Sequence, residues 1–169
     1  MPSEIQKNLV EKNAEYARTF TQGDLALPPA KKYLVVTCMD ARIDPAAAFG
    51  ISLGDAHVIR NAGASAKDAQ RSIVISEQLL GTREIILVKH TGCGMLTFTN
   101  EDAHGLVKQN LGPTAAAELA TLDFLPFSDL DAAVKEEVQF LQKSATVPED
   151  VKISGWVYEV ETGKARQVV

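Results

Sequence analysis

Three short runs rich in Val, Ile and Leu, each long enough for one strand, constrain the fold of this chain more than any other feature. They cover residues 33–37, 56–60 and 84–89, and residues 67–80 between the last two carry apolar groups at helical spacing. Strands of a parallel sheet read as continuous apolar runs because helices cover both faces. The order strand, connection, strand, helix, strand therefore predicts an α/β fold with a mostly parallel central β-sheet flanked by helices.

Weaker patterns extend this fold to both ends of the chain. Residues 3–20 predict an amphipathic helix, which Gly23 and the doublet Pro28-Pro29 separate from the first strand. Residues 99–110, 115–121 and 128–143 predict further helices, the last capped by Ser128. Residues 153–160 and 165–169 predict terminal strands joined by a turn. A chain of 169 residues is expected to form one domain over 1–169, with an N-terminal arm at 1–28, a core at 33–97 and further helices and strands at 98–169.

Charge and composition exclude several kinds of partner. The net charge is −5 and the isoelectric point about 5.2, so a nucleic-acid partner is not expected. No apolar stretch reaches the length of a membrane span, and the N-terminus lacks the features of a secretory signal. These observations predict a cytoplasmic protein with no membrane partner. In that compartment cysteines are more often metal ligands, catalytic groups or buried apolar residues than disulfides.

Metal-binding residue types stand at the ends of two predicted strands. Cys38 follows the first strand, while His90 and Cys93 follow the third. Because the carboxyl ends of parallel strands meet at one edge of a sheet, we expect these three side chains to lie together. Thiolate and imidazole are ligands that zinc prefers, and two cysteines with one histidine leave an open fourth position, which is typical of catalytic zinc. The sequence therefore predicts one Zn²⁺ per chain, held by Cys38, His90 and Cys93.

Asp40 and Arg42 decide the state of the fourth position. Asp40 lies two residues after Cys38, close enough to serve as a fourth ligand in a closed site. A bidentate pair with Arg42 would instead hold the carboxylate away from the metal and leave room for water. Asp40 could then orient the bound hydroxide, which makes Asp40 and Arg42 the predicted catalytic residues. The sequence does not choose between the two states.

Three segments resemble the β-class carbonic anhydrases, most closely a compact subgroup of that family. They are Cys38-x-Asp40-x-Arg42, residues 54–63 (GDAHVIRNAG) and residues 90–94 (HTGCG), and they match the family in order and spacing. Ala41 departs from the usual serine and Ala64 from a frequent asparagine, so altered surroundings of the metal are expected rather than loss of activity. The resemblance implies zinc on Cys38, His90 and Cys93, with Asp40 and Arg42 as a gating dyad. It also implies reversible hydration of carbon dioxide by zinc-bound hydroxide, and a homodimer or dimer of dimers in which the N-terminal helix packs on the partner subunit. Packing of this helix on its own domain is the alternative, and the sequence does not separate the two.

Other functions are compatible with parts of the same pattern. The same scaffold supports hydrolysis of carbon disulfide or carbonyl sulfide, and these motif residues do not distinguish the substrates. A catalytically silent zinc-binding module would keep Asp40 on the metal. Arg42 argues against this reading, because it offers the Asp40 carboxylate a different partner. A thiol-redox protein would need a closer cysteine pair. For proton relay His57 and His104 are candidates, although a structural position is the more common reading of each.

Overall fold

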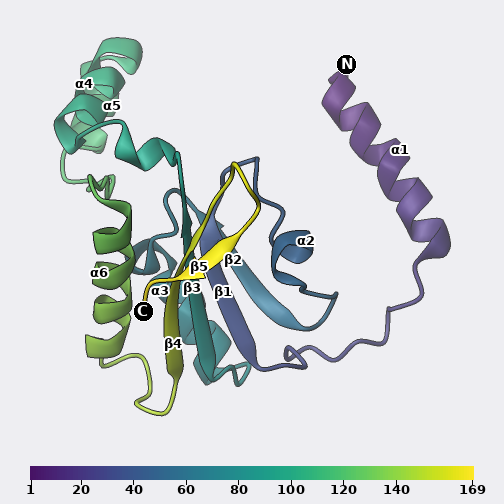
Figure 1. Cartoon of the computed structure of the whole chain (residues 1–169). Helices are drawn as coiled ribbons and strands as arrows, with labels where there is room; N and C mark the ends of the chain where they lie inside the picture. Colours follow the sequence, from purple (N-terminus) through teal and green to yellow (C-terminus); the bar gives the residue numbers. More distant parts are fainter.

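Five strands form one sheet in the order β2-β1-β3-β4-β5 in this computed structural model, which describes residues 1–169 (Figure 1). The strands are β1 (Tyr33–Cys38), β2 (Ala56–Asn61), β3 (Glu84–His90), β4 (Lys152–Tyr158) and β5 (Ala165–Gln167). Strands β1 to β4 run parallel to their neighbours, and only β5 is antiparallel, to β4. The predicted mostly parallel sheet is therefore confirmed.

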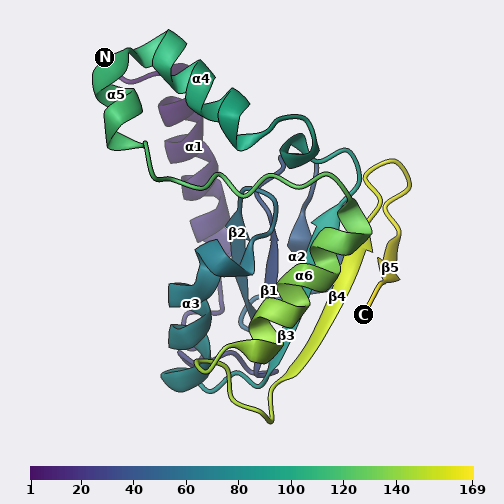
Figure 2. The same ribbon diagram turned by 90° about the vertical axis from the view of Figure 1, so that its left-hand side faces the viewer.

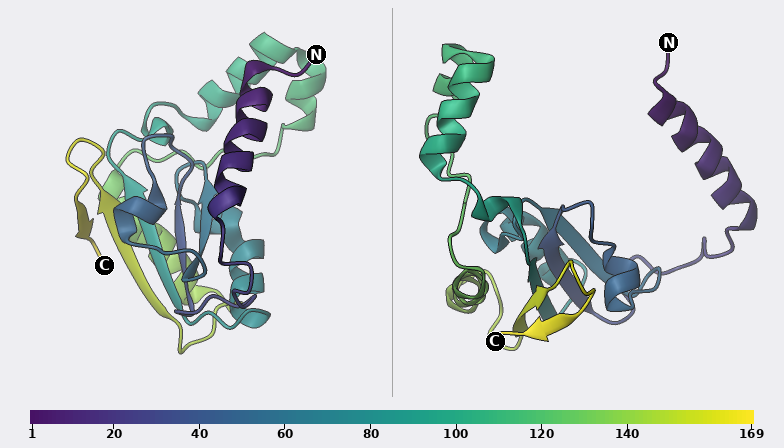
Figure 3. Two further views of the ribbon diagram at one scale, coloured as in Figure 1. Left: turned by 90° about the vertical axis from the view of Figure 1, so that its right-hand side faces the viewer. Right: turned by 45° about the horizontal axis from the view of Figure 1, so that its top comes forward.

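Helices cover the two faces of the sheet unequally. The helices are α1 (Glu4–Thr19), α2 (Pro45–Phe49), α3 (Ala66–Gln78), α4 (Asn100–Leu111), α5 (Pro113–Glu118) and α6 (Leu130–Lys143), with a short 3-10 helix η1 (Gly94–Leu96). Helices α3 and α6 lie side by side on one face (Figure 2). The short helix α2 lies on the other face (Figure 3). The main core accordingly forms beneath α3 and α6.

The start of α6 and the presence of α2 differ from the expectation. The α6 helix begins at Leu130 and its N-cap is Asp129, whose carboxylate accepts a hydrogen bond from the Ala132 amide at 2.7 Å. Ser128 is therefore not the cap, so that prediction was wrong. The unpredicted helix α2 begins after Asp44, which caps two amides, and ends at Gly50 in the left-handed conformation. Its five residues are too few to show a helical period.

Twelve buried side chains join the sheet to α3 and α6. Leu34, Val36, Ile85 and Leu87 come from β1 and β3, and each is completely buried. They pack on α3 and α6 through Ala66, Ala69, Ile73, Val134, Val138 and Leu141, and the cluster is completed by Val151 and Val157. This packing holds β1 and β3, the two strands whose ends carry the predicted ligands, against a fixed helical layer.

The α1 helix stands apart from the sheet, as the views in Figures 1 and 3 agree. A capping box between Ser3 and Gln6 starts it, yet none of its residues is buried. Ile5, Leu9 and Tyr16 are more than half exposed, although their spacing places them on one helical face. No helix in the structure combines the length and the apolar character that a membrane crossing requires.

Close packing of α6 on β4 depends on Gly155. A Cβ at this position would come within 2.5 Å of Val134 Cγ1 and 2.9 Å of Val138 Cγ2. We expect Gly155→Ala to lower the free energy of unfolding by about 1–3 kcal/mol, since it overpacks this contact. Gly105→Ala is the matched control, because nothing lies within 4 Å of its Cβ position in α4 and alanine favours helix. Urea unfolding measures both variants, and equal stability of Gly155→Ala and wild type would contradict this packing.

Candidate metal centre

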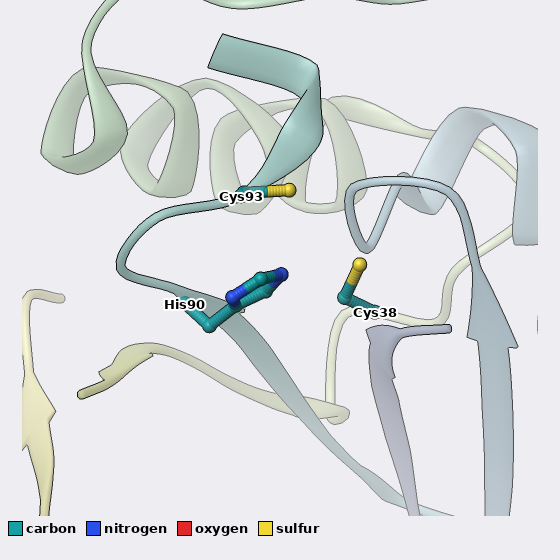
Figure 4. A group of neighbouring side chains, drawn as sticks. All are labelled: Cys38, His90 and Cys93. Atoms are coloured by element: carbon teal, nitrogen blue, oxygen red, sulfur yellow. The ribbon is translucent and has the colours of Figure 1, made fainter. Parts of the chain in front are cut away.

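Cys38, His90 and Cys93 converge at the carboxyl end of the sheet (Figure 4). One ligand atom from each lies within 4.8 Å of the other two. The residues are 4%, 0% and 2% exposed, so the cluster is shielded from bulk water. The structure therefore brings together the three residues that the sequence singled out, in a group that could hold a metal ion.

Strand pairing explains this convergence. Cys38 is the last residue of β1 and His90 the last of β3, and the two strands are parallel neighbours in the register Thr37 to Val88. Gly92 adopts a positive φ of 57° in the following turn, a conformation that favours glycine. The turn brings Cys93 back to the cluster as the residue preceding η1. The Cys93 sulfur therefore reaches the cluster from the turn that follows β3.

The His90 ring is oriented by its own backbone neighbourhood. Its Nδ1 lies 2.8 Å from the Thr91 carbonyl oxygen, and a carbonyl can only accept, so the proton belongs on Nδ1. The other ring nitrogen, Nε2, is buried and has no hydrogen-bond partner. A buried polar atom without a partner is costly unless something binds it. A carbonyl on Nδ1 with Nε2 free is the usual arrangement of a metal-binding histidine, so the donor set fits a metal ion.

The two cysteines share their environment. A hydrogen bond from the Cys93 thiol lowers the pKa of Cys38, and the same contact raises the pKa of Cys93, because the two sulfurs compete for one proton. Both cysteines are free rather than bridged. A divalent cation would replace the shared proton and bind both sulfurs as thiolates.

Asp40 is held beside this cluster by Arg42. Arg42 Nε donates to Asp40 Oδ1 at 2.9 Å and Nη2 donates to Oδ2 at 2.7 Å. The Arg42 side chain, followed by its backbone amide, holds the pKa of the Asp40 carboxyl well below its usual range. Asp40 Oδ2 is 3.7 Å from His90 Nε2. The carboxylate is thus adjacent to the cluster, with both oxygens engaged by Arg42.

Further contacts fix the turn that carries Asp40. Arg42 Nη2 also donates to the Gly92 carbonyl at 2.9 Å, which ties the dyad to the segment between His90 and Cys93. Arg60 donates to the carbonyls of Cys38 and Asp40 at 3.0 and 2.7 Å. Arg60 therefore has a structural role in this turn. The position of Asp40 depends on side chains from two neighbouring strand ends.

The other two histidines make their contacts elsewhere. His57 Nδ1 lies 2.7 Å from Ser76 Oγ, and its strand position pairs with Leu34, towards the amino end of β1. His104 Nε2 lies 3.0 Å from the Leu122 carbonyl, and its ring packs against Phe124. These contacts match the structural readings of both residues.

One buried charge beside the cluster carried no signal in the sequence. Lys89 precedes His90 in β3, and its side chain is 2% exposed. A lysine at the end of a strand normally indicates solvent, so only the folded structure reveals its position.

Comparison with known proteins gives full-length matches. Residues 33–165 match the protein family described as carbonic anhydrase. The chain is 39% identical over 167 residues to Beta-carbonic anhydrase 1 of Mycobacterium tuberculosis, covering 97% of this chain and 98% of the relative. The solved structure of the carbonic anhydrase from Glaciozyma antarctica is 46% identical, with a TM-score of 0.95 and coverage of 99% and 100%. Carbon disulfide hydrolase of an Acidianus species is 34% identical over 187 residues, covering 99% and 90%.

We expect Arg42→Gln to raise the pKa of Asp40 towards that of an ordinary carboxyl, because the guanidinium that stabilises the charged form is lost. In wild type the Arg42–Asp40 pair contributes its full stabilisation at pH values above the ordinary pKa of a carboxyl. That contribution is lost as the pH falls through the lowered pKa of Asp40. NMR titration of the carboxyl carbons measures the shift.

Arg166→Gln is the matched control. Arg166 forms an equivalent two-point contact with Asp131 at 3.0 and 2.6 Å on the surface. It should raise the pKa of Asp131 alone. An unchanged Asp40 titration in Arg42→Gln would show that the dyad does not form in solution.

Proposed function

Because the chain belongs to the β-carbonic anhydrase family of enzymes, we propose that it is a zinc enzyme that reversibly hydrates carbon dioxide to bicarbonate and a proton. The observation that carries this proposal is the cluster of Cys38, His90 and Cys93 with the Asp40–Arg42 pair at its edge. Neither part of the site alone would support it.

Zinc suits the donor set of the cluster. Two sulfurs and one imidazole nitrogen match its preferred ligands, and three protein ligands leave the fourth tetrahedral position for reaction. When bound in such a site, zinc supplies a nucleophile near neutral pH by lowering the pKa of water. Both thiols must stay reduced to bind it, so we place the enzyme in the reducing cytoplasm.

Asp40 and Arg42 have separate roles in this proposal. Asp40 Oδ2 faces the ligand cluster and accepts a hydrogen bond from the attacking nucleophile, which fixes the direction of its lone pair towards carbon dioxide. Arg42 occupies both carboxylate oxygens, so Asp40 does not become the fourth ligand. The arrangement therefore favours an open site over a closed one. It also speaks against a catalytically silent module in which Asp40 stays on the metal.

Hydrolysis of carbon disulfide is the second candidate function. The relatives named carbon disulfide hydrolase, such as that of Acidianus at 34% identity, favour it. Carbonyl sulfide has the same linear shape and would react through the same residues. The higher identity to relatives named carbonic anhydrase makes carbon dioxide our first choice.

The α1 helix supports assembly as a homodimer or a dimer of dimers. Ile5, Leu9 and Tyr16 are 80%, 65% and 57% exposed on one helical face, and no part of the same chain covers them. A continuous apolar face of this kind marks an interaction site. We propose that a second copy of the chain covers this face, as the resemblance to the family implies.

Asp40→Asn tests the catalytic proposal. We expect it to keep about one zinc per chain, since Asp40 is not a ligand, and to slow hydration of carbon dioxide by about 10²–10⁴-fold. Asp131→Asn is the matched control, because Asp131 also pairs with an arginine but lies on the surface, and it should retain wild-type activity. Metal analysis and stopped-flow assay measure both properties.

The same preparations are assayed for sulfide release from carbon disulfide. Zinc with sulfide release and no hydration would move the assignment to the second candidate. A wild-type chain that binds no zinc would refute both.

Leu9→Glu tests the assembly. A charge on the exposed apolar face of α1 should dissociate the oligomer to the 18.2 kDa chain, because it cannot be buried without a partner. Glu11→Gln, on the opposite helical face, should leave the oligomer intact. Sedimentation equilibrium measures the masses, and a wild-type protein that sediments as a single chain would contradict this role of α1.

A further inference from the structure

Lys89 lies on the face of β3 opposite to His90. Successive side chains of a strand point to opposite faces, so Lys89 follows Ile85 and Leu87 towards the layer of α3 and α6. Its side chain is 2% exposed. Lysine is almost never fully buried unless its charge is paired, so its surroundings indicate what the ammonium does.

The ammonium is surrounded by acceptors from three parts of the chain. Lys89 Nζ donates to the Gly63 carbonyl at 2.7 Å and lies 3.4 Å from the Ala64 carbonyl. Glu137 Oε1, from α6, is 3.6 Å away, and the Phe127 ring centroid is 4.5 Å away. Glu137 Oε2 accepts a hydrogen bond from the Ala66 amide at 2.8 Å, at the first residue of α3. Lys89 and Glu137 thus hold the turn before α3 from both sides.

That turn packs against the metal cluster. Met95 belongs to the same buried cluster as Cys38 and Cys93. Gly63 has a φ of 74°, and a Cβ there would come within 2.7 Å of Met95 Cγ, next to the Cys93 segment. Ala64 also has a positive φ, 55°, which costs free energy in a residue with a side chain. Contacts outside the turn are therefore needed to keep this conformation.

The ammonium also acts on the cluster through its charge. Lys89 Nζ lies 4.5 Å from the centroid of the Phe127 ring, and Phe127 packs against the buried cluster that contains Cys38 and Cys93. One side chain thus separates the ammonium from the cluster of the two sulfurs, near enough for an electrostatic interaction. Inside a protein such interactions are much stronger than in water. Two thiolates gathered in a buried site benefit from a buried cation on the same side.

We propose that Lys89 and Glu137 form a buried positioning pair for the metal centre, with Lys89 holding the turn at Gly63 against the ligand cluster and offsetting the negative charge of both thiolates. This inference rests on the proposed function, in which Cys38 and Cys93 bind zinc. Lys89 does not touch the metal or the substrate. The positive charge of Lys89 reduces the electron donation of the sulfurs. Glu137 holds Lys89 in place and partly offsets that positive charge.

Cobalt replacing zinc reports electron donation by the thiolates, because the energy of the sulfur-to-cobalt charge-transfer band falls as the sulfur becomes a stronger donor. Lys89→Met removes the cation at similar side-chain length, so the band should move to longer wavelength. Glu137→Gln keeps an acceptor for the Ala66 amide but removes the anion facing Lys89, so the band should move to shorter wavelength. Lys67→Met, an exposed lysine of α3, is the control and should leave the band unchanged.

Chelator competition provides a second readout. Lys89→Met should weaken zinc binding by about tenfold, as expected for a residue that supports metal ligands. Opposite band shifts in Lys89→Met and Glu137→Gln support the proposal, because a merely structural pair would not change sign. An unshifted band in both folded variants, with unchanged zinc affinity, overturns it.

Two further outcomes are distinguishable. If Lys89→Met does not fold, Glu137→Gln decides: a shorter wavelength supports the positioning role, and an unshifted band refutes it. A wild-type chain that takes up neither cobalt nor zinc overturns the proposed function itself, and the inference with it.

Discussion

The parallel pairing of β1 with β3 is the constraint on which the rest of this structure depends. It places the ends of two strands side by side, in the register Thr37 to Val88, and so brings Cys38 beside the segment from His90 to Cys93. The apolar layer of α3 and α6 fixes both strands from one face. The position of the metal cluster therefore follows from the packing of the sheet.

Charges around the cluster are arranged in two cation–anion pairs. On its accessible side Arg42 holds Asp40, and on its buried side Lys89 faces Glu137. In the proposed enzyme the first pair keeps a carboxylate available to the nucleophile, and the second tunes the thiolates. Both cations also bind backbone carbonyls of turns that carry the ligands or pack against the ligand cluster. Each arginine or lysine thus combines an electrostatic role with a geometric one.

Much of this architecture could be predicted from the sequence, because strands β1 to β3 are marked by apolar runs and their ends by rare residue types. Cys38, His90 and Cys93 stand out for that reason. The capping of α6 could not be predicted, since Ser128 and Asp129 are both good N-cap residues and the entry angle of the chain chooses between them. Lys89 could not be predicted either, because its burial depends on Glu137 from a helix far along the chain. The zinc and catalytic roles remain proposals that the folded geometry supports.

X-ray absorption at the zinc edge tests the central claim most directly, in wild type and in Asp40→Asn. The account predicts two sulfurs at about 2.3 Å, one imidazole nitrogen at about 2.0–2.1 Å and one further oxygen, unchanged when Asp40 is replaced. Fewer than two sulfurs would contradict the ligand set. Loss or replacement of the oxygen in Asp40→Asn would show that the carboxylate itself occupies the fourth position and that Arg42 does not hold it away.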